Sequence, residues 1–247
     1  MCGRYTLIAS PEALRALFGY DERPNFPPRY NIAPTQPIAI VRMVEGKRQF
    51  ALVRWGFLPS WADDPKTFSL LINARGETVR GKPAYQAAMK RRRCLIPADG
   101  FYEWRARGPG KRPFYVRARS GAPLAFAGLW ETWTGPNGEE LDTAAVVTTR
   151  ANKTLGDLHE RMPVIVPVAA FDLWLNTADV DAAAALITPA PEGLLEACEV
   201  STAVNRTAND DPNLIEPLGV NQSPAASERA RAPVKRYKRD DRQLSLF

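Results

Sequence analysis

The sequence predicts an α+β fold, a single domain built on a curved, mostly antiparallel β-sheet that is barrel-like and carries a few short flanking helices. Short β-branched and apolar runs, typical of strands, recur along the chain. The 247 residues include 22 Pro and 16 Gly, which interrupt long helices. The strand-like runs do not alternate with helical patterns, as they would in a doubly wound parallel sheet.

The elements follow in order from the amino terminus. A short amphipathic helix is expected first, because Ser10 suits the N-cap, Pro11 the first helical position and Gly19 the end. Gly135 to Gly138 predict a hairpin turn that joins residues 130–133 to a strand from Leu141 onward. The other expected strands cover residues 38–43, 49–55, 93–96, 114–117, 124–129, 143–149 and 164–166, and the other helices residues 168–176 and 180–186.

The charge of the chain is concentrated near its end. The formal net charge is +6, and residues 228–242 contribute seven cations and three acids, 7 − 3 = +4. From residue 221 onward few side chains could build a core. The sequence therefore predicts a domain over residues 1–220 and a disordered basic tail over residues 221–247.

Composition excludes several classes of protein. No run approaches the roughly 18 apolar residues that a membrane span needs, and no signal-peptide pattern opens the chain. Three scattered cysteines and one histidine exclude a disulfide framework and a zinc cluster. We expect a protein without a metal site that is cytoplasmic, and associated with the nucleoid when engaged on DNA.

Cys2 and His159 are chemically distinctive. Initiator methionine is removed from chains whose second residue is small, which would leave Cys2 with a free α-amino group. That group titrates at roughly 7.7–8.0, so part of it is an unprotonated nucleophile at neutral pH. Amine and thiol can both add to one aldehyde carbon and close a thiazolidine ring. His159 is the sole histidine and the one imidazole able to shuttle protons near neutrality.

Several segments occur in a characteristic order. They are MCGRYT at 1–6, NIAPTQ at 31–36, WGFLPSW at 55–61, INARGET at 72–78, IPADGFYEW at 96–104, LHERMPV at 158–164 and, last, Val-Ser-x-x-Val-Asn at 200–205. Together they resemble the SRAP family (SOS-response-associated peptidase), whose members cross-link covalently to abasic sites in single-stranded DNA. The resemblance covers residues 1–205 and leaves the tail outside.

The resemblance implies a role for five residues. Cys2 matches the family's nucleophile, exposed after loss of Met1. Glu103 matches the catalytic carboxylate and His159 the catalytic histidine. Asn73 and Arg75 match residues that bind the abasic sugar and its flanking phosphates. The implied product is a thiazolidine that shields the lesion, formed with imine chemistry like that of a lyase and needing no metal or organic cofactor.

Further residues are candidates for contact with single-stranded DNA. Pro34 and Trp61 lie in segments that resemble the family's wedge, which parts the strand at the lesion. Exposed aromatic side chains can stack on bases, and cations can bind phosphates without reading sequence. The candidate phosphate ligands are Arg4, Arg75, Arg80, Lys82, Arg150 and Arg161. Residues 90–93, a run of four cations, fit a phosphate track or a solvated face.

The last five residues form a possible partner motif. Gln243, Leu244, Ser245, Leu246 and Phe247 resemble the pentapeptide with which many bacterial repair proteins bind the replication sliding clamp. A peptide that follows a basic tail suits a tethered ligand. The alternative is a tail end that packs on its own domain. One domain that engages one lesion needs no second subunit, so we expect a monomer.

Two other functions remain open at this point. One is a thiol peptidase, or an autopeptidase that removes Met1, with Cys2 and His159 as nucleophile and base. The other is a non-catalytic adaptor that links the clamp to damaged DNA. Each candidate also has a structural interpretation: Cys2 as a small buried residue, Glu103 as the partner of an arginine, and His159 as a satisfied hydrogen-bonding group.

Overall fold

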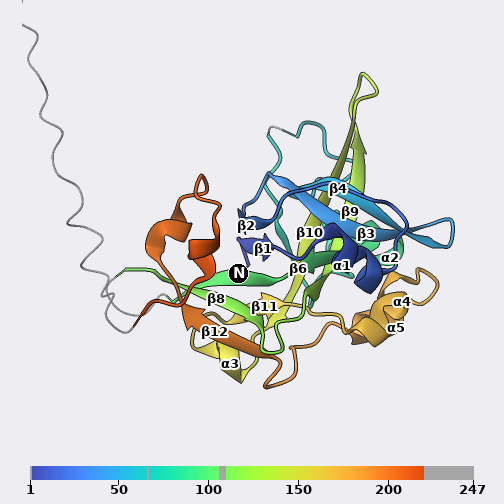
Figure 1. Ribbon diagram of the computed structural model, residues 1–247. Coiled ribbons are helices and arrows are strands. Elements are labelled where there is room, and N and C mark those ends of the chain that lie inside the picture. The colour runs from blue at the N-terminus through green and yellow to red at the C-terminus, as the bar shows by residue number, and fades with distance from the viewer. Residues whose placement is uncertain (1, 66, 106–109, 220–247) are drawn as a thin grey trace, which may run out of the picture. The chain divides into compact units, whose positions relative to one another are not determined.

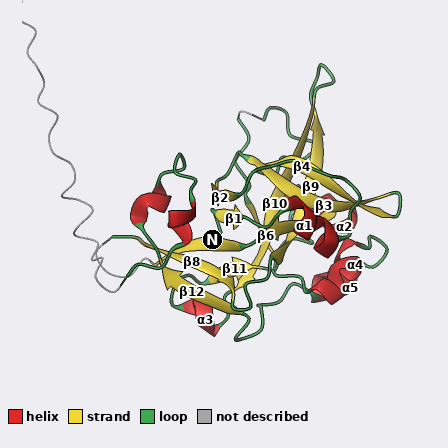
Figure 2. Ribbon diagram, in the orientation of Figure 1, coloured by secondary structure: helices red, strands yellow, loops and turns green. Residues whose placement is uncertain are grey.

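Two β-sheets form the folded part of the chain (Figures 1 and 2). The structure is a computed structural model, and it describes residues 2–65, 67–105 and 110–219. Strands dominate these residues, and the helices are short and flank the sheets. The first compact unit of the chain ends at Pro217. The α+β class predicted from the sequence is confirmed.

The larger sheet closes on itself. β3 (Pro37–Val44) pairs with β4 (Lys47–Trp55) and β6 (Arg93–Ala98), and β9 (Leu124–Thr134) pairs with β6 and β10 (Glu140–Arg150). The ring is completed by β4 and β10, which pair in parallel, whereas the other four contacts are antiparallel. This closure explains the barrel-like curvature expected from many short strands.

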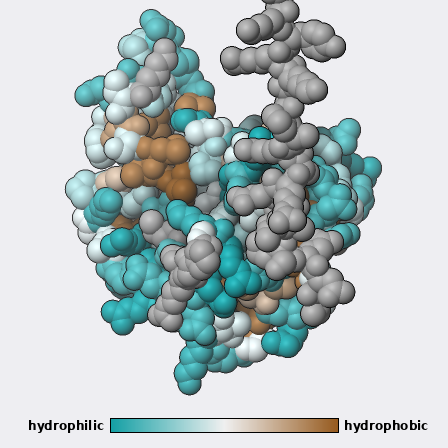
Figure 3. All heavy atoms as spheres, turned by 90° about the vertical axis from the view of Figure 1, so that its left-hand side faces the viewer, coloured by the Kyte–Doolittle hydropathy of each residue, from teal (hydrophilic) through white to brown (hydrophobic). Residues whose placement is uncertain are grey.

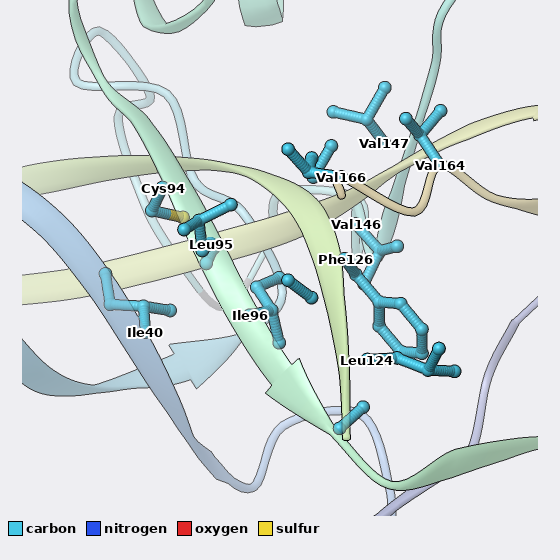
Figure 4. Close-up of a cluster of buried hydrophobic side chains, with 14 of the residues drawn as sticks. Ile40, Cys94, Leu95, Ile96, Leu124, Phe126, Val146, Val147, Val164 and Val166 are labelled. Atoms are coloured by element: carbon cyan, nitrogen blue, oxygen red, sulfur yellow. The ribbon is translucent and has the colours of Figure 1, made fainter. Parts of the chain in front are cut away.

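The barrel strands contribute many side chains to the main hydrophobic core, part of which is drawn in Figure 4. Ile40, Ile96, Phe126 and Val146 come from four different barrel strands, and all four are buried. A Cβ atom at Gly128 would lie 2.7 Å from the sulfur of Cys94 and 2.8 Å from Ile96. Close packing of this kind makes the barrel a rigid support.

The smaller sheet holds the amino-terminal strand in its interior. Its order is β12 (Leu195–Glu199), β8 (Arg112–Ala118), β7 (Gly100–Arg105), β1 (Tyr5–Leu7) and β2 (Arg29–Ile32). A single residue, Asp99, separates β6 of the barrel from β7. Its carboxylate accepts hydrogen bonds from the backbone N–H groups of Ile8 and of Ala9, the latter at 2.9 Å. The chain after β1 is thereby fixed where the two sheets meet.

The first helix follows its sequence signals. In α1 (Pro11–Phe18) the Ser10 hydroxyl accepts from the N–H of Ala13 at 3.2 Å, and Gly19 ends the helix with φ 70°. Leu14 and Phe18 are buried on its inner face. The remaining helical segments are α2 (Pro83–Arg91), α3 (Lys153–Gly156), η1 (Val168–Ala170), α4 (Phe171–Leu175), α5 (Val180–Ala185), η2 (Thr202–Asn205) and η3 (Pro212–Ile215).

One local prediction differs from the structure, and α2 is among the elements that the sequence does not predict. The strand expected at residues 164–166 is wrong: the strand is β11 (Arg161–Pro163), and Ile165 forms an isolated bridge with Phe126. Val164 and Val166 are buried, and their backbone N–H groups donate to the carbonyl oxygens of Val147 and Ala125, each at 2.9 Å. The sequence does not predict α2, because Lys82 at its N-cap makes no capping hydrogen bond that would mark its start.

The face drawn in Figure 3 carries many hydrophilic side chains. Figure 3 shows an apolar area on one face with hydrophilic neighbours around it. The large hydrophobic side chains exposed among the described residues are Leu52, Trp61, Leu70, Val168 and Leu173. No helix in the described ranges is long and apolar enough to cross a membrane.

Candidate functional site

Cys2 lies just before β1 and is fully buried in the chain that retains Met1. Its sulfur contacts the carbonyl oxygen of Arg4 at 3.9 Å. Burial raises the pKa of the thiol well above its usual range, and the negative charge of Glu103 raises it further. Cys2 therefore carries a protonated thiol at neutral pH, next to a carboxyl group.

Asn73 holds the backbone of Cys2 in place. It begins β5 (Asn73–Arg75), which pairs in parallel with residues 146–148 of β10. The Asn73 side-chain N–H donates to the carbonyl oxygen of Cys2 at 2.9 Å, and the Tyr85 hydroxyl donates to the carbonyl oxygen of Asn73 at 3.0 Å. Oδ1 of Asn73 is buried and has no hydrogen-bond partner among the described residues. That oxygen can accept a hydrogen bond from a bound molecule.

Glu103 reaches the same place from β7. The antiparallel pairing of Tyr5 with Phe101 brings Glu103 alongside the residues that precede β1. The Glu103 side chain is almost completely buried. Burial raises the pKa of its carboxyl from 4.5 to about 7. Glu103 can therefore take up or release a proton near neutral pH, as a general acid or base must.

His159 lies between α3 and β11. Nδ1 of its ring accepts the backbone N–H of Arg161 at 2.9 Å. Because an N–H group can only donate, Nδ1 is unprotonated and the neutral ring carries its proton on Nε2. Burial lowers the pKa of His159 below its usual value of 6.5. His159 is thus mainly neutral at pH 7, with Nε2 as its donor.

The Arg161 side chain is held by protein groups. Its guanidinium forms a bidentate ion pair with Glu77, with N–O distances of 3.0 and 2.9 Å. It also donates to the carbonyl oxygen of Thr148 at 2.7 Å and to the Thr148 hydroxyl. Arg161 is a predicted phosphate ligand, but most of its guanidinium N–H groups already have protein acceptors.

Arg4 is similarly engaged. Its guanidinium donates to Oδ1 of Asn31 at 2.7 Å and to the carbonyl oxygens of Val204 and Asn205 at 2.8 and 3.3 Å. These contacts tie the segment that carries Cys2 to η2. Arg4 is a predicted phosphate ligand, but its contacts in the structure are those of a structural anchor.

Exposed cations lie around the Arg161 ion pair. Arg75 and Lys82, together with Glu77, Thr78 and Gly81, line a surface pocket of about 620 Å³. Arg150 is exposed at the end of β10 and pairs in register with Arg161. No hydrogen bond or ion pair links the guanidinium groups of Arg75 and Arg150 to other described residues, so both can meet phosphates. Arg80 instead pairs with Asp181 at 2.6 Å.

The basic run at residues 90–93 divides into separate environments. Lys90 and Arg91 are exposed, whereas Arg92 pairs with Glu131 at 3.1 Å. Arg93 is buried and donates to backbone carbonyl oxygens, among them that of Trp174 at 2.6 Å. A continuous phosphate track over the whole run is therefore excluded.

Trp61 is the most exposed of the predicted stacking residues, with 59% of its surface accessible. Its ring packs edge-on against Phe68, with centroids 5.8 Å apart. Phe68 lines a pocket of about 530 Å³ together with Thr35, the neighbour of Pro34. The two segments of the predicted wedge thus meet at one pocket. Among the other tryptophans, Trp133 and Trp174 are buried and Trp104 and Trp130 are half-buried.

Sequence reasoning missed Glu77 and Thr148. Glu77 belongs to the Asn-Ala-Arg-x-Glu motif, which was the available signal, but the motif does not say which side chain the carboxylate meets. Among the described residues no cluster of His, Cys, Asp and Glu could hold a metal ion. The predicted clamp-binding residues Gln243, Leu244, Leu246 and Phe247 lie outside the described ranges.

A family model described as SOS response associated peptidase (SRAP) matches residues 1–207. The chain belongs to this family. Abasic site processing protein YoqW of Bacillus subtilis is 38% identical over an alignment of 222 positions that covers 87% of this chain and 99% of that protein. Abasic site processing protein HMCES of Gallus gallus is 30% identical over an alignment of 278 positions that covers 94% of this chain and 83% of that protein.

Solved structures of similar fold extend the comparison. A phage-related protein from Bordetella bronchiseptica is 34% identical, with a TM-score of 0.65, over 81% of this chain and 94% of that chain. A protein from Bacteroides thetaiotaomicron has a TM-score of 0.78 at 22% identity, over 87% of this chain and 99% of that chain. The second likeness concerns the fold alone.

Proposed function

We propose that this SRAP-family protein acts in the DNA-damage response by capturing abasic sites in single-stranded DNA. After removal of Met1, Cys2 joins the lesion through a thiazolidine and shields it. The relatives named abasic site processing proteins support the substrate. The observation that carries the mechanism is the packing of Cys2 between Asn73 and Glu103, whose pKa is raised to about 7.

The first step uses the α-amino group of Cys2. Its nitrogen attacks C1′ of the ring-opened sugar aldehyde and gives a carbinolamine. Loss of the C1′ hydroxyl as water needs a proton donor, and protonated Glu103 supplies that proton. His159 donates a hydrogen bond from Nε2 to the oxygen that leaves, and Asn73 accepts one from the sugar through Oδ1. The product of this step is an imine and one water molecule.

The second step closes the ring. The sulfur of Cys2 adds to the imine carbon while the imine nitrogen gains a proton, so that a C–S bond replaces the C=N π bond. Because the thiol is protonated at neutral pH, ionised Glu103 takes the S–H proton and passes it to the nitrogen. Aldehyde and aminothiol combine with the net loss of one water. Ring closure removes the imine before it can promote β-elimination and strand cleavage.

The thiol state disfavours the peptidase alternative. Thiol peptidases use a thiolate whose pKa is lowered by a neighbouring cation. Burial and Glu103 have the opposite effect on Cys2. Acyl transfer at sulfur also does not require a free α-amine, whereas imine formation does. Acetylation of the processed amino terminus should therefore abolish capture, whereas a peptidase would remain active.

Contacts to DNA would rest on phosphates and stacking. Arg75, Lys82 and Arg150 supply exposed charge, and Trp61 supplies an exposed ring. Such contacts carry little sequence information, so recognition should follow the lesion and the single strand. We place the protein in the cytoplasm, at the nucleoid when engaged, as a monomer whose terminal Gln-Leu-Ser-Leu-Phe binds the sliding clamp.

Replacing Cys2 by Ala tests the order of the two steps. A processed Cys2→Ala chain keeps the α-amine and loses the thiol, so the imine persists and a weak strand-cleaving activity should appear. Cleavage of an abasic oligonucleotide on a denaturing gel measures it, with the double variant Cys2→Ala/Glu103→Gln as the control. A chain that neither cross-links nor cleaves would favour initial attack by the thiol.

A further inference from the structure

The ion pair between Glu77 and Arg161 joins two parts of the site that are distant in sequence. Arg161 lies on β11 and Glu77 follows β5 by two residues. Thr148 of β10 pairs in register with Arg75 of β5 and with Pro163 of β11. A residue can pair with two strands at once only if those strands lie on opposite sides of its own strand, here β10. The Arg161 side chain therefore crosses β10 to reach Glu77.

The two strands that it joins lead to two site residues. β5 begins at Asn73, whose amide group holds Cys2. β11 begins at Arg161, whose backbone N–H donates to Nδ1 of His159. The N–H of Gly76 also donates to the carbonyl oxygen of Thr148 at 2.8 Å, which seats the residue before Glu77 against β10. The ion pair thus links the segment that follows Asn73 to the residue that donates to His159.

We propose that Glu77 is a positioning residue: its bidentate pairing with Arg161 holds His159 in the Nε2–H form. The proposal deepens the proposed function, on which its catalytic meaning rests. The catalytic contact remains with His159, and Glu77 acts through Arg161.

The hydrogen bonds of Arg161 argue against the other role, a phosphate ligand. Of its five guanidinium hydrogens, those on Nε and Nη2 and one on Nη1 have acceptors on Glu77 and Thr148. One Nη1 hydrogen remains among the described residues. The side chain is only 10% exposed, against 44% for Glu77. Two parallel hydrogen bonds from a planar guanidinium to a carboxylate are the usual geometry of a well-ordered Arg–Glu ion pair.

The single histidine allows a direct test without DNA. Full-length protein labelled with ¹⁵N-histidine gives one pair of ring signals, which report the tautomer of His159 above its pKa. We expect an unprotonated Nδ1 and a protonated Nε2 in the wild type. In Glu77→Gln we expect a mixture that includes the Nδ1–H form. An unchanged single tautomer in Glu77→Gln would overturn the proposal.

Asp181→Asn is the matched control. It removes one negative charge and breaks the exposed pair with Arg80, but leaves Arg161 untouched. We expect the wild-type tautomer in this variant. If Glu77→Gln does not fold, Thr148→Val removes the hydroxyl acceptor of Arg161 in a side chain of similar shape, and it should show the same mixture of tautomers. A single wild-type tautomer in Thr148→Val would contradict the proposal.

Kinetics separate positioning from phosphate binding. At saturating abasic DNA, Glu77→Gln should slow the covalent step by at least about tenfold, since small misplacements of reacting groups have effects of this size. Its affinity for DNA should change little. Tighter binding with an unchanged covalent rate would show instead that Glu77 competes with phosphate for Arg161. The tautomer measurement does not involve DNA, so failure of the proposed capture would leave it interpretable.

Discussion

At the scale of single residues, the site combines burial with chemistry that needs protons to move. The thiol of Cys2 and the carboxyl of Glu103 are both buried, and burial raises the pKa of each. Burial instead lowers the pKa of His159, so its ring is mainly neutral. Glu103 is therefore the group that changes its charge near neutral pH, and the histidine serves as a fixed donor.

Neutralising Glu103 should stabilise the fold at high pH. The folded-state pKa is raised from 4.5 to about 7, so the contribution of the carboxyl to stability is complete below about pH 4.5 and is lost as the pH rises through 7. One pKa unit corresponds to about 1.4 kcal/mol, so ionisation costs the fold about 3 kcal/mol at pH 8. Glu103→Gln should be more stable than the wild type by that amount at pH 8, and equal to it near pH 4.5.

Urea denaturation at both pH values measures this difference. The exposed Glu140→Gln variant is the control, and its stability should follow the wild type at each pH. A stability difference for Glu103→Gln that is independent of pH would contradict the raised pKa. The same variant should lose cross-linking activity, because it can neither give nor take a proton.

At the scale of elements, the segment around η2 anchors the strand that follows Cys2. Asn31 is completely buried, accepts from Arg4 at 2.7 Å and donates to the carbonyl oxygens of Arg206 and Asn209 at 3.0 and 2.8 Å. Trp104, which follows Glu103 in the chain, donates from its indole N–H to the side chain of Asn205 at 2.8 Å. These contacts connect η2 to β1, β2 and β7.

Removing the Asn31 side chain should loosen this anchor. Asn31→Ala removes the amide that donates to the carbonyl oxygens of Arg206 and Asn209 and accepts from Arg4, at a cost of about 3 kcal/mol of unfolding free energy, since each unpaired group costs about 1–3 kcal/mol. Hydrogen exchange should accelerate in residues 201–210. Asn25→Ala, at an exposed position, should stay within about 0.5 kcal/mol of the wild type. Unchanged exchange in Asn31→Ala would contradict the anchor.

At the scale of the whole molecule, we expect the domain to carry out cross-linking and the predicted tail to contribute DNA affinity and clamp binding. A chain that ends at Gly219 lacks seven cations and three acids, a net +4. We expect it to keep the thermal midpoint and the cross-linking rate of the full chain. It should bind undamaged single strands less tightly at low salt, because fewer counterions are released.

The same truncated chain should no longer bind purified sliding clamp, as measured by calorimetry. Clamp binding that survives truncation would exclude the terminal motif as the binding site.

Local signals make part of this fold predictable. Ser10, Pro11 and Gly19 predict α1 correctly, because caps act within a few residues. The turn sequence at residues 135–138 predicts the hairpin that joins β9 to β10. The strand expected at 164–166 lies just before those residues, at β11 (Arg161–Pro163). The prediction fails because buried apolar residues next to a strand have the same composition as the strand itself.

Long-range contacts are beyond sequence reasoning. The predicted residues Cys2, Asn73 and Glu103 do meet, because their motifs are carried over from the family. The partners of Arg4 and Arg161 are not predictable, because a positive charge does not reveal whether a carbonyl, a carboxylate or a phosphate will meet it. The contact of Glu77 with Arg161 depends on the register of three strands.

Covalent capture is tested most directly by intact mass. Protein shown to begin with Cys2 is mixed with a single-stranded oligonucleotide that carries one abasic site, with no reductant, and analysed beside Cys2→Ala and an undamaged strand. The account predicts one adduct with the mass of protein plus oligonucleotide less one water, which requires both the lesion and Cys2. Absence of an adduct from correctly processed protein would contradict thiazolidine formation.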